Sequence, residues 1–107
     1  MNNRRDETRY LCSQLVTLHW TDELRVERKE TAVLENISAS GASVQSEVRI
    51  NWGTRIRLLA AKQQFRGTVR YCYWRDSGYF VGIEFDPDSQ WSRSKFEPEH
   101  LLDPGDV

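Results

Sequence analysis

Two groups of polar residues have types and spacings suited to ligand binding. One is a charged leader with three arginines, Arg4, Arg5 and Arg9. The other is the stretch 36–41, Asn-Ile-Ser-Ala-Ser-Gly, which follows an apolar run. Guanidinium groups bind phosphate oxygens in bidentate pairs and match the O6 and N7 edge of guanine. An amide and a hydroxyl offer donors and acceptors to a base or ribose. A ligand with phosphates and guanine bases would suit both groups.

Each group also has an ordinary interpretation. Asn, Ser and Gly are common in plain turns, where Gly41 would allow positive φ or the close approach of another backbone. Residues 1–9 contain no apolar residue after Met1, so a solvated leader is possible. We expect this segment to be a flexible arm that folds over a ligand when one is bound.

Apolar alternation predicts the elements that would position both groups. Runs bounded by turn residues predict six strands, at 10–20, 25–37, 41–48, 55–60, 65–74 and 79–85. Six short strands favour an all-β fold, a six-stranded antiparallel barrel, because closure leaves no exposed edge. The arm leads into the first strand and the turn ends the second, so both would lie at one rim. In the fifth strand, alternation places Val69, Tyr71 and Tyr73 on one face.

The sequence changes character after Asp86-Pro87. Residues 88–102 mix polar residues with the apolar Trp91, Phe96, Leu101 and Leu102. We expect a short C-terminal helix of one or two turns here, with Pro98 at a helix start, capping the barrel. The expected organisation is an arm at 1–9, a barrel at 10–86, and a helical cap and tail at 87–107.

Composition excludes several classes of function. The chain has 107 residues, a net charge of −1 and a pI near 6.1, without the basic surplus typical of proteins that bind long nucleic acids. No apolar run has the length of a membrane span, and the N-terminus has no signal-peptide core. We therefore expect a cytoplasmic protein with no membrane insertion.

Residues for catalysis or metal binding are not grouped in the sequence. No Ser-His-Asp or Cys-His arrangement and no Gly-rich phosphate loop is indicated, so we expect no enzyme and no cofactor. Free thiols are favoured over a zinc site, because ligand spacing is lacking in the set Cys12, Cys72, His19 and His100.

These residues resemble the signature of the PilZ domain family. Arg5-x-x-x-Arg9 followed by Asn36-x-Ser38-x-x-Gly41 is similar to the family's two-part motif, R-x-x-x-R and then [D/N]-x-S-x-x-G. The stretch 79–85, Tyr-Phe-Val-Gly-Ile-Glu-Phe, is similar to the family's closing strand. The resemblance implies a six-stranded barrel that binds the bacterial second messenger cyclic di-GMP (c-di-GMP) as a receptor.

The resemblance also implies roles for individual residues. The two motif arginines would hold phosphate and guanine, and the second half of the motif would contact guanine and shape the pocket. Arg4, immediately before the motif, is a feature of members that bind an intercalated pair of ligand molecules. Such a pair carries four negative charges, which gives a third guanidinium an electrostatic rationale.

Three functions remain open from the sequence. The first is a c-di-GMP receptor that signals to an unknown downstream protein by ordering of the arm. The second is a PilZ-like adaptor that works through protein contacts without nucleotide. The third is a small barrel that binds single-stranded nucleic acid through Arg66, Arg70 and nearby aromatic residues.

Overall fold

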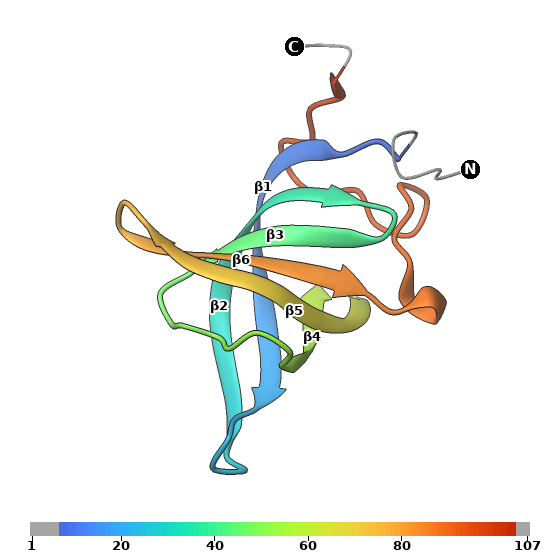
Figure 1. The fold of residues 1–107 in the computed structure, drawn as a ribbon. Helices are drawn as coiled ribbons and strands as arrows, with labels where there is room; N and C mark the ends of the chain where they lie inside the picture. Colours follow the sequence, from blue (N-terminus) through green and yellow to red (C-terminus); the bar gives the residue numbers. More distant parts are fainter. Residues whose placement is uncertain (1–6, 105–107) are drawn as a thin grey trace, which may run out of the picture.

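Six strands make up most of the described part of the chain, residues 7–104, in this computed structural model. They are β1 (Tyr10–Thr21), β2 (Glu27–Ser38), β3 (Gly41–Ser46), β4 (Arg55–Ala60), β5 (Gln63–Arg75) and β6 (Gly78–Phe85). All neighbouring strands are antiparallel, and they close into a barrel in the order β1-β2-β3-β6-β5-β4 (Figure 1). The expected all-β, six-stranded antiparallel barrel is confirmed.

The core fills the inside of this barrel. Every second residue of β4 is buried, namely Ile56, Leu58 and Ala60, as alternation predicted. Fully buried residues from the other strands meet them there, including Leu18, Leu34, Val44, Val69 and Val81. Burial of each large aliphatic side chain contributes about 1.5–3 kcal/mol, so this interior provides most of the driving force for folding.

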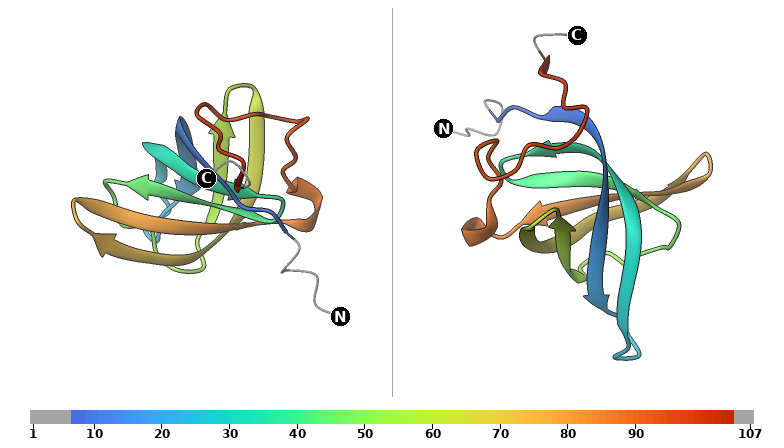
Figure 2. Two further views of the ribbon diagram at one scale, coloured as in Figure 1. Left: turned by 90° about the horizontal axis from the view of Figure 1, so that it is seen from above. Right: turned by 180° about the vertical axis from the view of Figure 1, so that it is seen from behind.

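Two hairpins extend beyond the closed part of the barrel, β1–β2 and β5–β6 (Figures 1 and 2). The β5–β6 hairpin turns within two residues, because Arg75 pairs with Gly78 across Asp76 and Ser77. Asp76 has a φ of 59°, a conformation that aspartate tolerates in tight turns. This turn lies between the strands that the sequence predicts at 65–74 and 79–85.

A bulge in β5 reverses the faces of its second half. Val69 pairs with Ile83, but Tyr71 pairs with Gly82, so Arg70 is the extra residue on this strand. Tyr71 and Tyr73 therefore face outward, 38% and 48% exposed. The expectation that both tyrosines share a face with Val69 is wrong, since alternation does not continue through a bulge.

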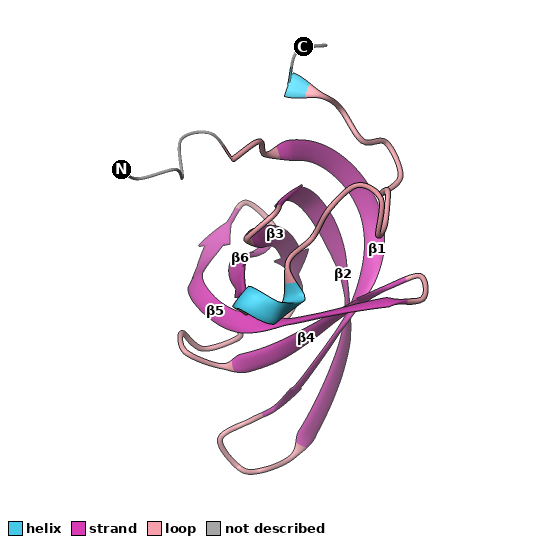
Figure 3. Ribbon diagram, turned by 90° about the vertical axis from the view of Figure 1, so that its right-hand side faces the viewer, coloured by secondary structure: helices cyan, strands magenta, loops and turns pink. Residues whose placement is uncertain are grey.

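The segment after β6 is not helical as expected. It begins with a 3-10 turn, η2 (Pro87–Ser89), and residues 90–103 form turns and extended backbone (Figure 3). The predicted C-terminal helix, with Pro98 at its start, is therefore wrong. The backbone N–H of Trp91 donates to the Ala39 carbonyl at 2.9 Å, and that of Leu102 donates to the Leu11 carbonyl at 2.7 Å. Backbone groups of this segment are thus partly satisfied by the barrel, and Trp91 is buried in its core.

Candidate functional site

The last residues of the arm lie against the turn between β2 and β3. The guanidinium Nη1 of Arg9 donates a hydrogen bond to Asn36 Oδ1 at 2.5 Å. The hydroxyl of Ser40 donates to Glu7 Oε2 at 2.6 Å. The structure therefore brings together the end of the first half of the motif and the start of the second.

Strand register explains this contact. Tyr10, the first residue of β1, pairs with Ile37 near the end of β2. Because the two strands are antiparallel, the residues that precede Tyr10 reach the rim where β2 turns into β3. The other two arginines of the candidate site, Arg4 and Arg5, lie outside the described residues.

Ser38 and Gly41 lie beneath the rim surface. Ser38 is 1% exposed, and its hydroxyl donates to the Gly41 carbonyl at 3.3 Å. A Cβ built on Gly41 would come 2.5 Å from the Ile83 carbonyl oxygen of β6. Among the described glycines, positive φ is found at Gly53 and not at Gly41. Glycine at position 41 therefore allows the β6 backbone to approach closely. These two residues therefore set the shape of the turn, and Asn36 presents its amide at the surface.

A depression of about 580 Å³ opens beside the arm, between β3, β5 and β6. Its volume is within the usual range for small-molecule sites. Arg9 and Arg70 supply two positive charges to its lining, and Glu7 and Glu84 supply two negative charges. Arg70 forms an ion pair with Glu84 at 2.7 Å. Arg9 forms no ion pair with any carboxylate of residues 7–104, so its charge is available to an anion.

Glu7 remains a carboxylate at this rim. Burial raises the pKa of Glu7, but hydrogen bonds from Ser40 and Ser38 and the charge of Arg9 outweigh burial and lower the pKa below its ordinary value. A fixed negative charge therefore lies beside the cation that an anionic ligand would use.

Tyr71 forms one wall of the depression, at a position that sequence alternation misplaced. Its hydroxyl shares a hydrogen bond of 2.7 Å with Ser43. Its ring covers Gly82, where an added Cβ would come 2.0 Å from a ring carbon. Tyr71 also stacks on Tyr73 and Phe80, with ring centroids 5.8 Å apart in each case. A glycine inside an otherwise apolar strand was the available signal for this close approach.

The two cysteines do not form a disulfide with each other. Cys12 and Cys72 are free, and the described residues contain no group of three or more His, Cys, Asp or Glu side chains placed to hold a metal ion. Burial, with a smaller effect from the Glu35 charge, raises the pKa of Cys12 to about 11.

Within residues 7–104, no helix has the length and apolar character needed to cross a membrane.

Comparisons with known proteins agree with this architecture. The search of curated proteins finds no match to the sequence. A solved structure described as "PilZ domain with c-di-GMP of YcgR from Escherichia coli" superimposes with a TM-score of 0.61 at 13% identity, covering 80% of this chain and 82% of that one. At this identity the match shows a shared fold. The family model for the PilZ domain matches residues 3–97, and the chain therefore belongs to the PilZ domain family.

Proposed function

We propose that this protein is a receptor for c-di-GMP that binds its ligand where the arm meets the β2–β3 turn. The hydrogen bond between Arg9 and Asn36 carries this proposal, because it joins the two halves of the motif in space. Membership of the PilZ family supports the receptor class. The adjacent depression of about 580 Å³ offers room for a nucleotide.

Each motif residue has a role that fits its position. Arg5 and Arg9 bind phosphate oxygens and the guanine edge through their guanidinium forks. Asn36 reads the base with its amide, because its side chain lies at the rim. Buried Ser38 and closely packed Gly41 hold the turn in the shape that presents Asn36.

Ligand binding exchanges one contact for another. In the structure, Asn36 Oδ1 already accepts a hydrogen bond from Arg9. A guanine bound to Asn36 competes for that oxygen and frees the Arg9 guanidinium for the ligand phosphate. The arm then packs on the ligand instead of the turn, which changes the surface offered to a protein partner.

Arg4 extends the same site to a second ligand. Two intercalated c-di-GMP molecules carry four negative charges, and Arg4 adds a third guanidinium to those of Arg5 and Arg9. Isothermal titration gives the stoichiometry directly. A stoichiometry of two ligands per chain for the wild type and one for Arg4→Gln supports this role of Arg4. A stoichiometry of one ligand for both proteins excludes it.

Titration of the purified protein with c-di-GMP, with GTP as the control ligand, tests the main proposal. Saturable heat with c-di-GMP alone is expected. Arg9→Ala weakens this binding, and Arg49→Ala leaves it unchanged, because Arg49 is an exposed residue that lines a different depression. Equal affinity of both variants and the wild type excludes Arg9 from the site.

A nucleotide-free adaptor is the second candidate. It is favoured by the contacts that the arm already makes without ligand, Arg9 to Asn36 and Ser40 to Glu7. The absence of heat and of thermal shift with c-di-GMP would support this adaptor. Binding of single-stranded nucleic acid has less support, because Arg66 and Arg70 are paired with Asp88 and Glu84.

A further inference from the structure

A row of basic side chains crosses the outer face of the barrel over four adjacent strands. Strand register places His19 of β1 opposite Lys29 of β2 on one side and opposite Arg57 of β4 on the other. Arg57 in turn lies opposite Arg66 of β5. Since neighbouring strands lie about 4.8 Å apart, these residues form a line about 14 Å long. We name it the basic row: Lys29, His19, Arg57 and Arg66.

The row points outward and is only partly neutralised. The residues that flank His19 and Arg57 in sequence are buried, so these two side chains lie on the solvent side. Like charges directly opposite each other in a sheet are destabilising. Lys29 and Arg57 form no ion pair and no side-chain hydrogen bond with any residue in 7–104. These two cations therefore make no polar contact that would stabilise the described part of the fold, which favours a role in binding.

The same face is hollowed. A depression of about 430 Å³ is lined by all members of the basic row together with Arg28 and Arg55, and its charged lining also includes one carboxylate, Glu27. Trp20 and Ile56, both buried core residues, form its floor. Positive charge in a concave surface over an apolar floor attracts anions more strongly than the same charge on a flat, fully hydrated surface.

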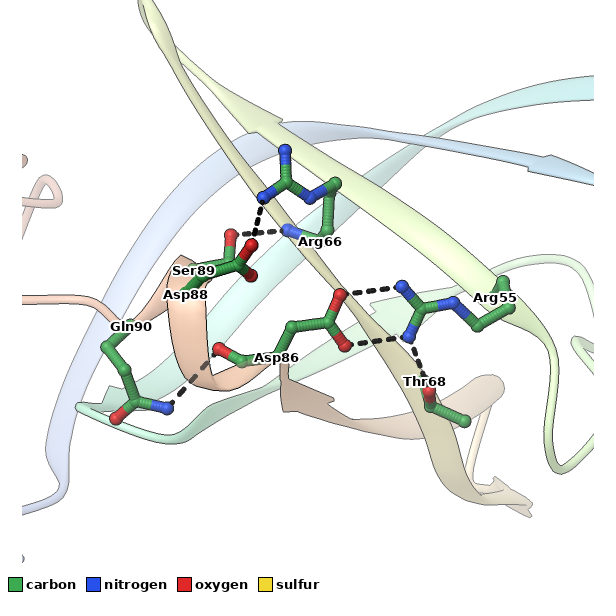
Figure 4. A network of polar contacts seen from close by, with 7 residues as sticks. All are labelled: Arg55, Arg66, Thr68, Asp86, Asp88, Ser89 and Gln90. Carbon is green, nitrogen blue, oxygen red and sulfur yellow. Dashed lines mark hydrogen bonds and ion pairs between the residues drawn. The ribbon is translucent and has the colours of Figure 1, made fainter.

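Carboxylates border the row at both ends. Glu27 lies two residues from Lys29 on the same face of β2. At the other end, Asp88 forms an ion pair with Arg66 at 3.2 Å, as Figure 4 shows. In the same figure, the carboxylate of Asp86 accepts two hydrogen bonds from Arg55, at 2.7 and 2.6 Å. The unneutralised positive surface is therefore short.

We propose that the basic row docks a short acidic segment of a protein partner. Carboxylates of such a segment neutralise Lys29 and Arg57 and relieve the repulsion within the row. The acidic borders favour a short segment over a long polyanion, which would extend onto Glu27 and Asp88. Nucleic acid would also lack a stacking surface, since the aromatic residue lining this depression, Trp20, is only 8% exposed. The proposal is independent of c-di-GMP binding.

His19 provides a spectroscopic readout inside the row. Burial lowers the pKa of His19, the charges of Arg57 and Lys29 lower it further, and Glu27 opposes them. An acidic segment bound to these cations offsets their charge, so the pKa of His19 rises on binding. A titration of the His19 ring signals by NMR, with and without ligand, measures this change.

The test uses fluorescein-labelled hexaglutamate and the full chain. Fluorescence anisotropy at low salt should show saturable binding that weakens at 0.5 M salt, because exposed charges are screened. Hexaglutamine is the neutral control peptide. The double variant Lys29→Gln/Arg57→Gln should lose about fivefold in affinity, from the usual strength of exposed ion pairs. Lys62→Gln, an exposed cation in the β4–β5 turn, is the matched control and should bind as the wild type does.

The outcomes separate the acidic segment from other ligands. Hexaglutamate binding that depends on Lys29 and Arg57, with a rise in the pKa of His19, supports the proposal. The proposal is overturned if hexaglutamate fails to bind at low salt, or if Lys62→Gln weakens binding as much as the double variant does. Tighter binding of oligothymidylate or of vesicles rich in phosphatidylserine also overturns it.

Discussion

The rim and the basic row are two cationic regions with opposite local chemistry. At the rim, Arg9 donates to the neutral amide of Asn36, and a carboxylate lies nearby. In the basic row, Arg57 faces another arginine and a histidine in register, and no described carboxylate pairs with it. The described polar groups of the rim thus bind one another, whereas in the row two arginines lie opposite each other. Specific recognition is expected at the rim, and salt-sensitive docking is expected at the row.

Gly41→Ala should produce the largest difference between the rim and the basic row. The new Cβ would come 2.5 Å from the Ile83 carbonyl oxygen, and the shift that it forces costs about 2 kcal/mol of stability. Thermal unfolding should show a decrease in Tm of about 10 °C. Binding of c-di-GMP at the deformed rim should weaken, while hexaglutamate binding persists in the folded variant. Gly53→Ala is the control. The new Cβ meets no neighbouring atom there, and the positive φ of 86° alone should cost about 1 kcal/mol of stability.

Arg9→Ala should affect the rim alone. It removes a charge-assisted hydrogen bond to the ligand, so affinity for c-di-GMP falls about tenfold. Titration calorimetry measures the loss, and anisotropy with hexaglutamate provides the control on the same sample. A parallel decrease in both affinities would show that the two regions are not independent.

Glu7→Gln should strengthen c-di-GMP binding by about threefold. The substitution removes the negative charge beside Arg9 but leaves an amide able to accept the hydrogen bond from Ser40. Competition between the Glu7 carboxylate and the ligand is the physical reason. Weaker binding by this variant, measured in the same titration, would instead make Glu7 a contact to the ligand.

Arg57→Gln should produce the smallest effect, a gain in stability of about 0.5 kcal/mol from relief of repulsion with Arg66. Thermal unfolding at low salt should show a rise in Tm of about 3 °C, which disappears in 0.5 M salt. Arg9→Gln should show no such rise. A lower Tm for Arg57→Gln would mean that this cation already stabilises the fold.

The sequence predicted the fold well where its signals are local. Alternation and turn residues placed all six strands, and β4 was predicted with the bounds that the structure has. The meeting of the arm and the turn at one rim also followed from strand order, and it is confirmed for Arg9 and Asn36. The placement of Arg4 and Arg5 stays a prediction.

Non-local interactions account for what the sequence did not show. The bulge at Arg70 depends on pairing with β6, so Tyr71 was placed on the wrong face. The apolar residues of the C-terminal segment indicated helical turns, but the backbone of Trp91 is bound by the barrel. The basic row joins residues far apart in the sequence, and only strand register brings them into line.

The antiparallel bridge between Leu11 and Leu102 links the C-terminal segment to β1, two residues beyond Arg9. The amide of Leu102 donates to the Leu11 carbonyl at 2.7 Å, and the Ser13 amide donates to Glu99. Hydrogen exchange at these amides therefore reports on the start of β1 from outside the ligand site. A fluorophore placed near residue 102 would use this bridge to report on the proposed ordering of the arm, without touching any proposed binding residue.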